Sequence, residues 1–397
     1  MLFEAARDEL VSFFKERDKI IDALFIALVG RLHLLMIGPP GTAKSALLNA
    51  VGKMSGLTVF RHLMTKFTTP EELFGPFSLA GLENDEYYRI ADGKLPTADT
   101  VFLDEIFKAN SAILNALLTA MEERYFDNGP HSKKIPLITL VGASNEPPED
   151  QVATAALYDR FHFRFWVGPV HDDSFLDVIM SQDPTWKRGL IDAGELLAAQ
   201  LLVPVIEIPV EVGEALRQVR RDLRNEGIPM SDRRARQILR SVMPASAVVN
   251  ERDKVTDEDA FLLPFVLAEK EGDLRKTSEI VYKYFACSKI EAEKKLDAFL
   301  ETLDEFFTET SQNPQAVTIE AAGKMLDRGK RLITELDELD TAKAAVLRKR
   351  LQGINSFLHE RYHISLPFGG NWDDQAKPTD GKSLIEKYRS VTRGEVQ

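Results

Sequence analysis

One stretch constrains the fold of this chain more than any other, the segment from His33 to Gly52 that reads HLLMIGPPGTAKSALLNAVG. An apolar run typical of a buried strand leads into a loop of glycines and prolines, and Lys44 and Ser45 then open a segment with helical spacing. Backbone N–H groups of such a loop and of a helix N-terminus converge on one point, which suits an anion. The stretch therefore predicts a phosphate-binding loop at the edge of an α/β fold.

The loop residues have separate expected roles in binding ATP and Mg²⁺. The side chain of Lys44 reaches the β- and γ-phosphate oxygens, and the Ser45 hydroxyl ligates Mg²⁺. Most such loops have glycine before the lysine, whereas this chain has Ala43, which we expect to adopt a negative φ with its methyl group directed away from the phosphates. A chance Gly/Pro turn is the alternative, and the order of strand, loop, Lys-Ser and helix argues against it. The expected nucleotide ligands are Gly38, Pro39, Pro40, Gly41, Thr42, Ala43, Lys44, Ser45 and Ala46.

The segment TVFLDEI offers a second part of the site, because its apolar run ends in Asp104 and Glu105. Alternate side chains leave a strand on opposite faces, but at a frayed strand end the two can diverge. We expect Asp104 to hold the Mg²⁺ shell and Glu105 to orient and deprotonate the attacking water. A solvated strand end is the alternative. Since loss of Glu105 would be the simplest way to lose hydrolysis, the intact pair favours hydrolysis over binding alone.

Two further polar residues lie beside other predicted strands. Asn145 lies in GASNEPP, after the apolar run 137–141, at the carboxyl edge where open α/β sheets bind ligands. There it could position the attacking water, although by itself it would be an ordinary turn asparagine. Arg160 in ALYDRF ends a helical stretch just before the last strand, and alone it would be a surface arginine.

The segment SDRRARQILR places Arg233, Arg234 and Arg236 in the first turns of a helix whose N-terminus already carries partial positive charge. Each such charge is unfavourable by about 0.3–1 kcal/mol at an exposed terminus, and a docked phosphate would reverse the sign. A solvated basic face and pairing with Asp222 or Asp232 are the alternatives. A nucleic-acid patch is a third, although no aromatic residues interleave with the arginines and the net charge of −12 opposes it.

Residues 1–168 are predicted to form an α/β nucleotide-binding domain with a parallel sheet, because helical patterns alternate with short apolar runs. Such continuous runs suit strands buried on both faces. Asn128 and Gly129, between short strand-like segments, predict a β-hairpin. The predicted strands are 32–37, 57–63, 100–103, 137–141 and 161–167, with a helix over 111–124.

The rest of the chain has mostly helical patterns. Residues 169–208 are irregular and are expected to be a linker with short helices. Residues 209–272 carry helical stripes with capping signals and are expected to form a helical lid domain. Residues 273–397 are expected to be a mostly α-helical C-terminal region, whose role the sequence does not indicate. The predicted fold class is therefore α/β, a parallel sheet flanked by helices with a helical lid.

Composition narrows the setting in which the chain works. Acidic residues outnumber Lys and Arg by 62 to 50, so no chain-wide field favours nucleic acid or anionic lipid. Cys287 is the only cysteine, which excludes an internal disulfide and fits a reducing compartment. The longest apolar run, 20–29, is well short of the roughly 20 residues that span a membrane, and acids near the N-terminus argue against a signal peptide. We expect a cytoplasmic location.

Several motifs together resemble the MoxR family of AAA+ ATPases, and its RavA-like subgroup in particular. They are GPPGTAKS, TKFTTPEELFGPFSL, VFLDEI, LLTAMEERYFDNG, VGASNEPPE and ALYDRF, with MTKFTTPEELFGP and SDRR pointing to the subgroup. Alanine before the loop lysine is ordinary for MoxR proteins, and the likeness fades beyond about residue 270. The resemblance assigns Lys44 and Ser45 to Walker A, Asp104 and Glu105 to Walker B, Asn145 to sensor 1, Arg160 to an arginine finger for the neighbouring subunit, and Arg233 to sensor 2.

The resemblance also implies a ring, usually a hexamer, in which ATP hydrolysis remodels, activates or assembles protein clients in the manner of a chaperone. It implies a partner protein with a von Willebrand factor A domain. Residues 73–96 resemble an insert in the second helix and residues 126–135 the hairpin before sensor 1, both on the pore side of the ring. A low-turnover, nucleotide-gated scaffold and a DNA-translocating ring are the alternatives.

Overall fold

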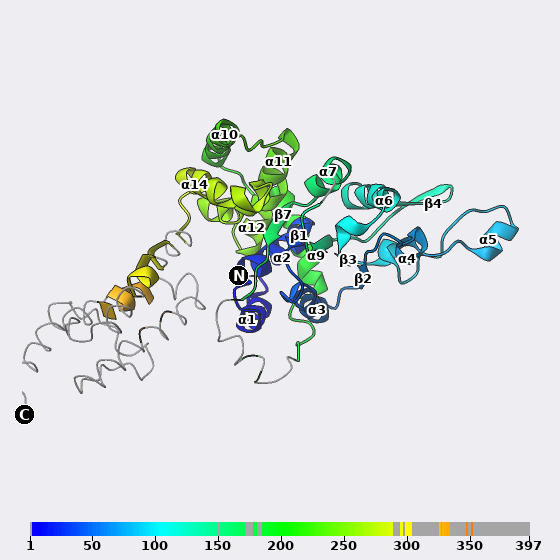
Figure 1. The fold of residues 1–397 in the computed structure, drawn as a ribbon, viewed down its shortest axis with the longest axis horizontal. Helices are drawn as coiled ribbons and strands as arrows, with labels where there is room; N and C mark the ends of the chain where they lie inside the picture. The colour runs from blue at the N-terminus through cyan, green and yellow to red at the C-terminus, as the bar shows by residue number, and fades with distance from the viewer. Residues whose placement is uncertain are drawn as a thin grey trace, which may run out of the picture. The chain divides into compact units, whose positions relative to one another are not determined.

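The computed structural model describes residues 2–148, 151–170, 178, 180 and 185–288, with helical residues at 294–296, 298–303, 325–326, 328–333, 347 and 351. The chain divides into two compact units, Met1–Phe285 and Ala286–Gln397. The described residues of the second unit from 294 onward are helical, as expected, and the rest of that region lies outside the described residues. The first unit contains the sheet and the predicted lid (Figure 1).

A five-stranded sheet forms the centre of the first unit, with the order β2-β3-β6-β1-β7 and every neighbouring pair parallel. Each strand lies at one of the predicted apolar runs, so the predicted parallel α/β sheet is confirmed. Side chains of β1 and β6 are buried throughout, whereas those of β2 are half-buried or exposed because β2 is an edge strand. The expectation of burial on both faces was therefore wrong for β2. The strands are β1 (Leu34–Ile37), β2 (Val59–Leu63), β3 (Thr100–Asp104), β6 (Thr139–Ser144) and β7 (Phe163–Trp166).

Helices cover both faces of the sheet. Alternate residues of each strand point to opposite faces, so each face contributes its own side chains to the core. On one face Leu24 and Leu48 line a small cavity together with Phe102 and Val141 of the sheet. On the other face apolar residues of α6 and α7 join the core that contains Leu103. The elements of this part are α1 (Glu4–Phe13), α2 (Asp18–Gly30), α3 (Lys44–Ser55), α4 (Pro70–Phe74), α5 (Leu79–Glu83), η1 (Leu95–Thr97), η2 (Ile106–Lys108), α6 (Ser111–Glu122) and α7 (Gln151–Arg160).

The predicted hairpin is present as β4 (Tyr125–Asn128) paired antiparallel with β5 (His131–Lys134). It binds the segment around α5, because Asn128 accepts from the Arg89 N–H at 2.6 Å and donates to Arg89 O at 3.0 Å. A Cβ at Gly129 would lie 1.9 Å from Tyr87 O, so this contact requires glycine at the turn. We call the hairpin and residues 75–94 together the arm, and Figure 1 shows β4 and α5 projecting from the sheet.

The remaining helices of the first unit pack on one another, and some of them also pack beside α2 and β7. Within the stretch expected to be a linker, Gln200 of α9 donates to Leu28 O of α2 at 2.9 Å, so the described part of that stretch packs on the core. The unit also includes α14, whose Lys283 and Tyr284 both donate to Asp222 of α10, and it ends at Phe285. These elements are α9 (Ala193–Leu202), η3 (Val203–Val205), α10 (Val210–Asn225), α11 (Asp232–Gln237), the π-turn η4 (Ile238–Val242), α12 (Met243–Val249), η5 (Asp257–Ala260), α13 (Leu263–Leu267), η6 (Glu271–Asp273) and α14 (Leu274–Tyr284).

Candidate nucleotide site and arginine cluster

The loop between β1 and α3 lies at the carboxyl edge of the sheet. The Gly38 N–H donates to Ser144 O at 3.0 Å, which ties the loop to the end of β6. A Cβ at Gly38 would lie 2.1 Å from Val167 O, so only glycine allows the end of β7 to come this close. Gly41 has a φ of 83°, in the left-handed region that glycine adopts without strain. Both glycines of the loop therefore have a backbone reason to be glycine.

Ala43 differs from its expected conformation. It caps α3 with φ of 63° and ψ of 15°, in the left-handed region, so the expectation of a negative φ was wrong. A residue with a Cβ costs about 1–2 kcal/mol in that region. Its side chain is exposed, so the cost of alanine here comes from the backbone conformation rather than from crowding.

Lys44 begins α3 with its side chain directed into the loop. Its Nζ donates to Gly38 O at 2.5 Å and to Pro39 O at 3.0 Å, and the residue is only 8% exposed. Burial lowers the pKa of Lys44, while the charges of Asp104 and Glu105 oppose that shift. The two carboxylates therefore lie within electrostatic range of the ammonium group. A phosphate in the loop would meet this same group as a charge-assisted donor.

Glu105 follows β3 in a strained conformation, with φ of 53°. Its N–H donates to Asp104 Oδ1 at 3.0 Å, Asn145 Nδ2 donates to its Oε1, and Lys108 Nζ lies 3.4 Å from its Oε2. Non-glycine residues with positive φ persist where the surrounding contacts hold them, and such residues cluster at functional sites. Lys108 was not anticipated from the sequence, although its position three residues after Glu105 was a usable signal.

Ser45 and Asp104 fit the chemistry of Mg²⁺. Magnesium is commonly held by one or two protein oxygens together with substrate phosphates and water. Ser45 lies in the first turn of α3, and Asp104 ends β3 at the same edge of the sheet. Among the residues that the structure describes, no group of three or more His, Cys, Asp or Glu could hold a metal by itself. The hydroxyl and the carboxylate therefore suit an ion whose coordination the phosphates complete.

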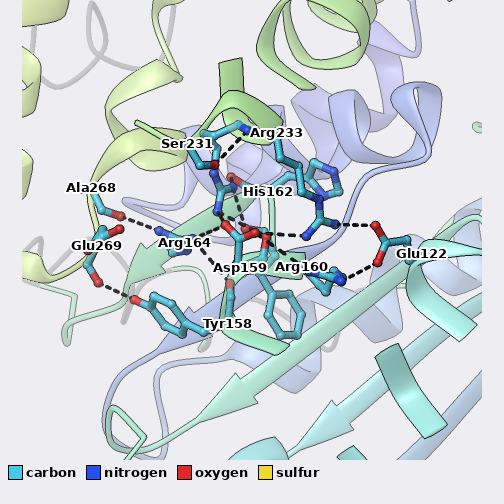
Figure 2. A network of polar contacts seen from close by, with 12 residues as sticks. Glu122, Tyr158, Asp159, Arg160, His162, Arg164, Ser231, Arg233, Ala268 and Glu269 are labelled. Atoms are coloured by element: carbon cyan, nitrogen blue, oxygen red, sulfur yellow. Dashed lines mark hydrogen bonds and ion pairs between the residues drawn. The ribbon is translucent and has the colours of Figure 1, made fainter. Parts of the chain in front are cut away.

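Arg160 and Arg233 lie in a second cluster, shown in Figure 2. Arg160 ends α7, and its Nη2 lies 2.5 Å from Glu122 Oε2. Arg233 comes from α11, donates through Nη1 to Asp159 Oδ2 at 3.0 Å, and places Nη2 3.6 Å from Glu122 Oε1. Glu122, the last residue of α6, therefore contacts both arginines.

Two other arginines of this cluster join α11 and the residues near Ala268 to β7. Arg234 is 4% exposed and donates to Asp159 Oδ1 and to Phe161 O, each at 2.9 Å. Arg164 of β7 donates to Ala268 O at 3.1 Å. Burial lowers the pKa of Arg234 to about 9, with a further contribution from Arg164, while Asp159 opposes the shift. Because both side chains are buried and bonded to backbone carbonyls, they hold the lid helices on the α/β core.

A pair of buried histidines, which sequence reasoning did not single out, lies beside the cluster. The ring of His33 accepts the Leu140 N–H at its Nδ1 and donates from Nε2 to Met121 O, both at 3.0 Å, so it is neutral. The His33 N–H donates to His162 Nδ1 at 3.1 Å. Burial lowers the pKa of both rings well below the ordinary value, and nearby arginines lower both further. Histidines bordering predicted apolar strands were the only signal available.

The loop and the arginine cluster lie at opposite edges of the sheet. The His162 N–H donates to His33 O directly before β7 and β1 begin, so Arg160, two residues earlier, lies at the amino edge. The loop that contains Lys44 leaves β1 at the carboxyl edge. A four-residue strand at about 3.3 Å per residue places the two edges about 13 Å apart. Arg233, expected to be sensor 2, therefore lies with the expected arginine finger and not with the loop lysine.

A parallel sheet with this strand order, a phosphate loop after β1, paired acids after β3, an asparagine after β6 and a helical lid define an AAA+ ATPase. Residues 2–198 match the family model of the MoxR domain in the MoxR-vWA-beta-propeller ternary systems, and residues 211–281 match an AAA lid domain. The chain belongs to the MoxR family of AAA+ ATPases.

Individual relatives are similar to parts of this chain, and one of them is named as a MoxR protein. The chain is 36% identical over 304 residues to the uncharacterized protein MJ0812 of Methanocaldococcus jannaschii, covering 75% of this chain and 81% of that protein. It is 26% identical over 202 residues to the chaperone MoxR1 of Mycobacterium tuberculosis, and the match covers 50% of this chain and 53% of that protein. A crystal structure of a candidate ATPase from Cytophaga hutchinsonii matches with a TM-score of 0.56 at 20% identity, covering 71% of this chain and 92% of that one, which supports the fold alone. Within the described part of the chain, no helix is long and apolar enough to cross a membrane.

Proposed function

We propose that this chain is the ATP-hydrolysing subunit of a homo-oligomeric ring that remodels, activates or assembles protein clients. The observation that carries the proposal is the position of Arg160 and Arg233 at the amino edge of the sheet, while Lys44 and Glu105 lie at the carboxyl edge. Arginines so placed cannot complete the site of their own subunit, and a head-to-tail ring brings one edge to face the other edge of the next subunit. The ring therefore supplies each site with parts of two chains.

The residues at the carboxyl edge bind the nucleotide and activate water in this proposal. Lys44 and the loop amides bind the phosphates, Ser45 and Asp104 hold Mg²⁺, and Glu105 accepts the proton of the attacking water. The metal ion would neutralise charge on the phosphate oxygens. Asn145 and the nearby Lys108 pair with the two oxygens of Glu105. Each carboxylate oxygen has a second lone pair, so Glu105 can accept the proton while these contacts stay in place.

The arginine cluster supplies positive charge to the neighbouring site. Arg160 is the proposed arginine finger and Arg233 the proposed sensor 2, both acting on the nucleotide of the next subunit. Their present partners are carboxylates, and phosphate oxygens accept from guanidinium groups with the same geometry. The cluster has more arginines than acids among its described members, which are Arg160, Arg164, Arg233, Arg234, Glu122 and Asp159.

Client and partner contacts are assigned to the arm and its surroundings. Large apolar side chains are exposed there at Phe67, Leu79, Tyr87 and Ile90, and exposed apolar groups mark interaction surfaces. The family description names a von Willebrand factor A protein, and one relative is named as a chaperone, which support a partner of that class and a chaperone-like action. A hexamer, a RavA-like subgroup and a cytoplasmic location complete the proposal. Its domain limits are 1–168 for the nucleotide domain, 169–208 for the linker, 209–272 for the lid and 273–397 for the helical C-terminal region.

A low-turnover, nucleotide-gated scaffold is the second candidate, favoured by the pairing of both Glu105 oxygens. Slow hydrolysis that no partner protein accelerates would favour it. The third candidate, a DNA-translocating ring, is opposed by the net charge of −12, and a salt-dependent mobility shift of DNA would favour it.

The proposal is tested by mixing two inactive variants. Arg160→Ala retains the nucleotide pocket but lacks the finger, whereas Lys44→Ala retains the finger but lacks the pocket. In a randomly mixed ring about half the pockets are intact and about half of those face an intact finger, so roughly a quarter of the interfaces are complete. We expect phosphate release from the co-assembled mixture that exceeds the release by either variant alone.

The control is wild-type protein titrated into each variant. If the mixture is inactive, this titration distinguishes two explanations. Either Arg160 does not act on the neighbouring subunit, or hydrolysis requires every site of the ring to be intact. If Arg160→Ala alone hydrolyses ATP as fast as wild type, the proposed function fails.

A further inference from the structure

Helix α6 connects the two edges of the sheet. It begins directly after Asn110, whose side chain accepts the Ile113 N–H at 3.1 Å, a few residues beyond Glu105 at the carboxyl edge. It ends at Glu122 beside the arginine cluster at the amino edge. Twelve residues at about 1.5 Å each give a length of about 18 Å, enough to cross the sheet. A single helix thus links Glu122 to the segment that follows Glu105.

The position of Glu122 is costly for an acid unless cations surround it. The C-terminus of a helix carries partial negative charge, which disfavours a carboxylate in the last turn. Arg160 and Arg233 offset this cost, at 2.5 Å and 3.6 Å from its two oxygens. The preceding residue, Met121, is fixed by a hydrogen bond, because its carbonyl accepts from the imidazole of His33. His33 directly precedes β1, the strand that leads to the loop with Lys44. The end of α6 is therefore fixed while the Glu122 side chain remains 45% exposed.

The arginines of the cluster divide into two kinds by their partners. Arg164 and Arg234 are buried and donate to backbone carbonyls. These two side chains cannot leave their partners unless the surrounding backbone unfolds. Arg160 and Arg233 are 22% and 29% exposed, and the polar contacts that the described structure gives them are all with carboxylate side chains. Partly exposed ion pairs contribute little net free energy, so replacing one partner anion by another costs little. The outer arginines can therefore be transferred to another anion while the inner ones keep the lid in place.

We propose that Glu122 is a positioning residue that holds Arg160 and Arg233 within their own subunit and competes for them with the nucleotide phosphate of the neighbouring subunit. This inference rests on the proposed ring. When a neighbour presents its phosphates, Arg160 exchanges the carboxylate for phosphate oxygens, and the rate depends on how readily Glu122 releases it. Glu122 thereby keeps the arginines from other anions until an adjacent nucleotide is in place.

The test compares Glu122→Gln with Glu123→Gln, its exposed neighbour in the chain. Glutamine keeps the size of the side chain and removes the charge, so we expect kcat for ATP to rise about two- to fivefold, the range of a partly exposed ion pair. KM should stay level or fall by no more than the same factor, because the released arginines can contact the phosphates of the neighbouring nucleotide before as well as during hydrolysis. Glu123→Gln should match wild type, and Glu122→Ala should show the same rise as Glu122→Gln.

The result is read on the full chain, with ring mass measured by light scattering for each variant. In an Arg160→Ala background, Glu122→Gln should give no rise, because Arg160 is missing and Asp159 still holds Arg233 at 3.0 Å. An unchanged or lower kcat for both Glu122 variants in intact rings would overturn the inference. The two failures are distinguishable. If the Arg160→Ala ring hydrolyses ATP at the wild-type rate, the proposed function fails. If the Arg160→Ala ring is impaired but the Glu122→Gln ring is no faster than wild type, only the role of Glu122 fails.

Discussion

The buried histidine pair should make the stability of the first unit depend on pH. His33 is 1% exposed and His162 8% exposed, and burial lowers the pKa of both rings well below the ordinary value. In the unfolded chain both titrate near 6.5. Below that pH the unfolded state binds protons that the folded state does not, so the stabilisation is present above about pH 6.5 and is lost as the pH falls.

The size of the loss follows from the linkage between proton binding and folding. One unbound proton changes the free energy of unfolding by about 1.4 kcal/mol per pH unit. Lowering the pH from about 7.5 to about 5.5 ends one full unit below the pKa of the unfolded histidines. Each imidazole therefore lowers the free energy of unfolding by about 1.4 kcal/mol, and the pair lowers it by about 2.7 kcal/mol. That is a large part of the roughly 5–15 kcal/mol by which a domain is stable.

The assay is urea unfolding at both pH values, followed by tryptophan fluorescence, since Trp166 lies in β7. His162→Asn keeps an acceptor near the position of Nδ1 but does not titrate, so the pH-dependent loss should shrink by about 1.4 kcal/mol. His131→Asn, in the exposed strand β5, is the control and should leave the loss unchanged. An equal loss for wild type and His162→Asn would refute the reasoning, because it would mean that His162 takes up its proton in the folded state.

Three further predictions test the site and the lid. Ala43→Gly removes the cost of a left-handed alanine and should raise the free energy of unfolding by about 1 kcal/mol. The control Ala46→Gly, inside α3, should lower the free energy of unfolding by about as much. A change in ATP turnover beyond about tenfold in Ala43→Gly would show that Ala43 tunes the site. Glu105→Gln should bind ATP with wild-type affinity in an equilibrium binding assay yet lose nearly all phosphate release, and comparable turnover would end its assigned role. Asp259→Asn should lower the unfolding free energy by about 3–5 kcal/mol in denaturation, because Asp259 is 1% exposed and pairs with Arg252 through both oxygens at 2.7 Å; a loss below about 1 kcal/mol would contradict this.

The parts of the fold that were predicted correctly are those encoded in short segments. The apolar runs of β1 and β6, the Asn128-Gly129 turn and the capped helix α6 all lie within windows of a dozen residues. Their hydrophobic period and turn residues are local properties, so they can be read without knowing what packs against them. Ala43 shows the limit, because its backbone angle depends on a loop whose path is set by β6 and β7 from far along the chain.

By itself, the sequence determined the α/β class, the glycine-containing loop after β1, and the meeting of Lys44, Asp104 and Asn145 at one edge, because parallel strands all end on the same side. The tertiary structure alone decided which edge each arginine occupies. Arg233 and Arg160 are separated by about seventy residues in the chain, and they come together because α6 places Glu122 between them and the lid packs on β7. Spacing along the chain carries no information about contacts between residues so far apart, since these depend on how whole elements pack, and the arginine cluster and the histidine pair both arise in this way.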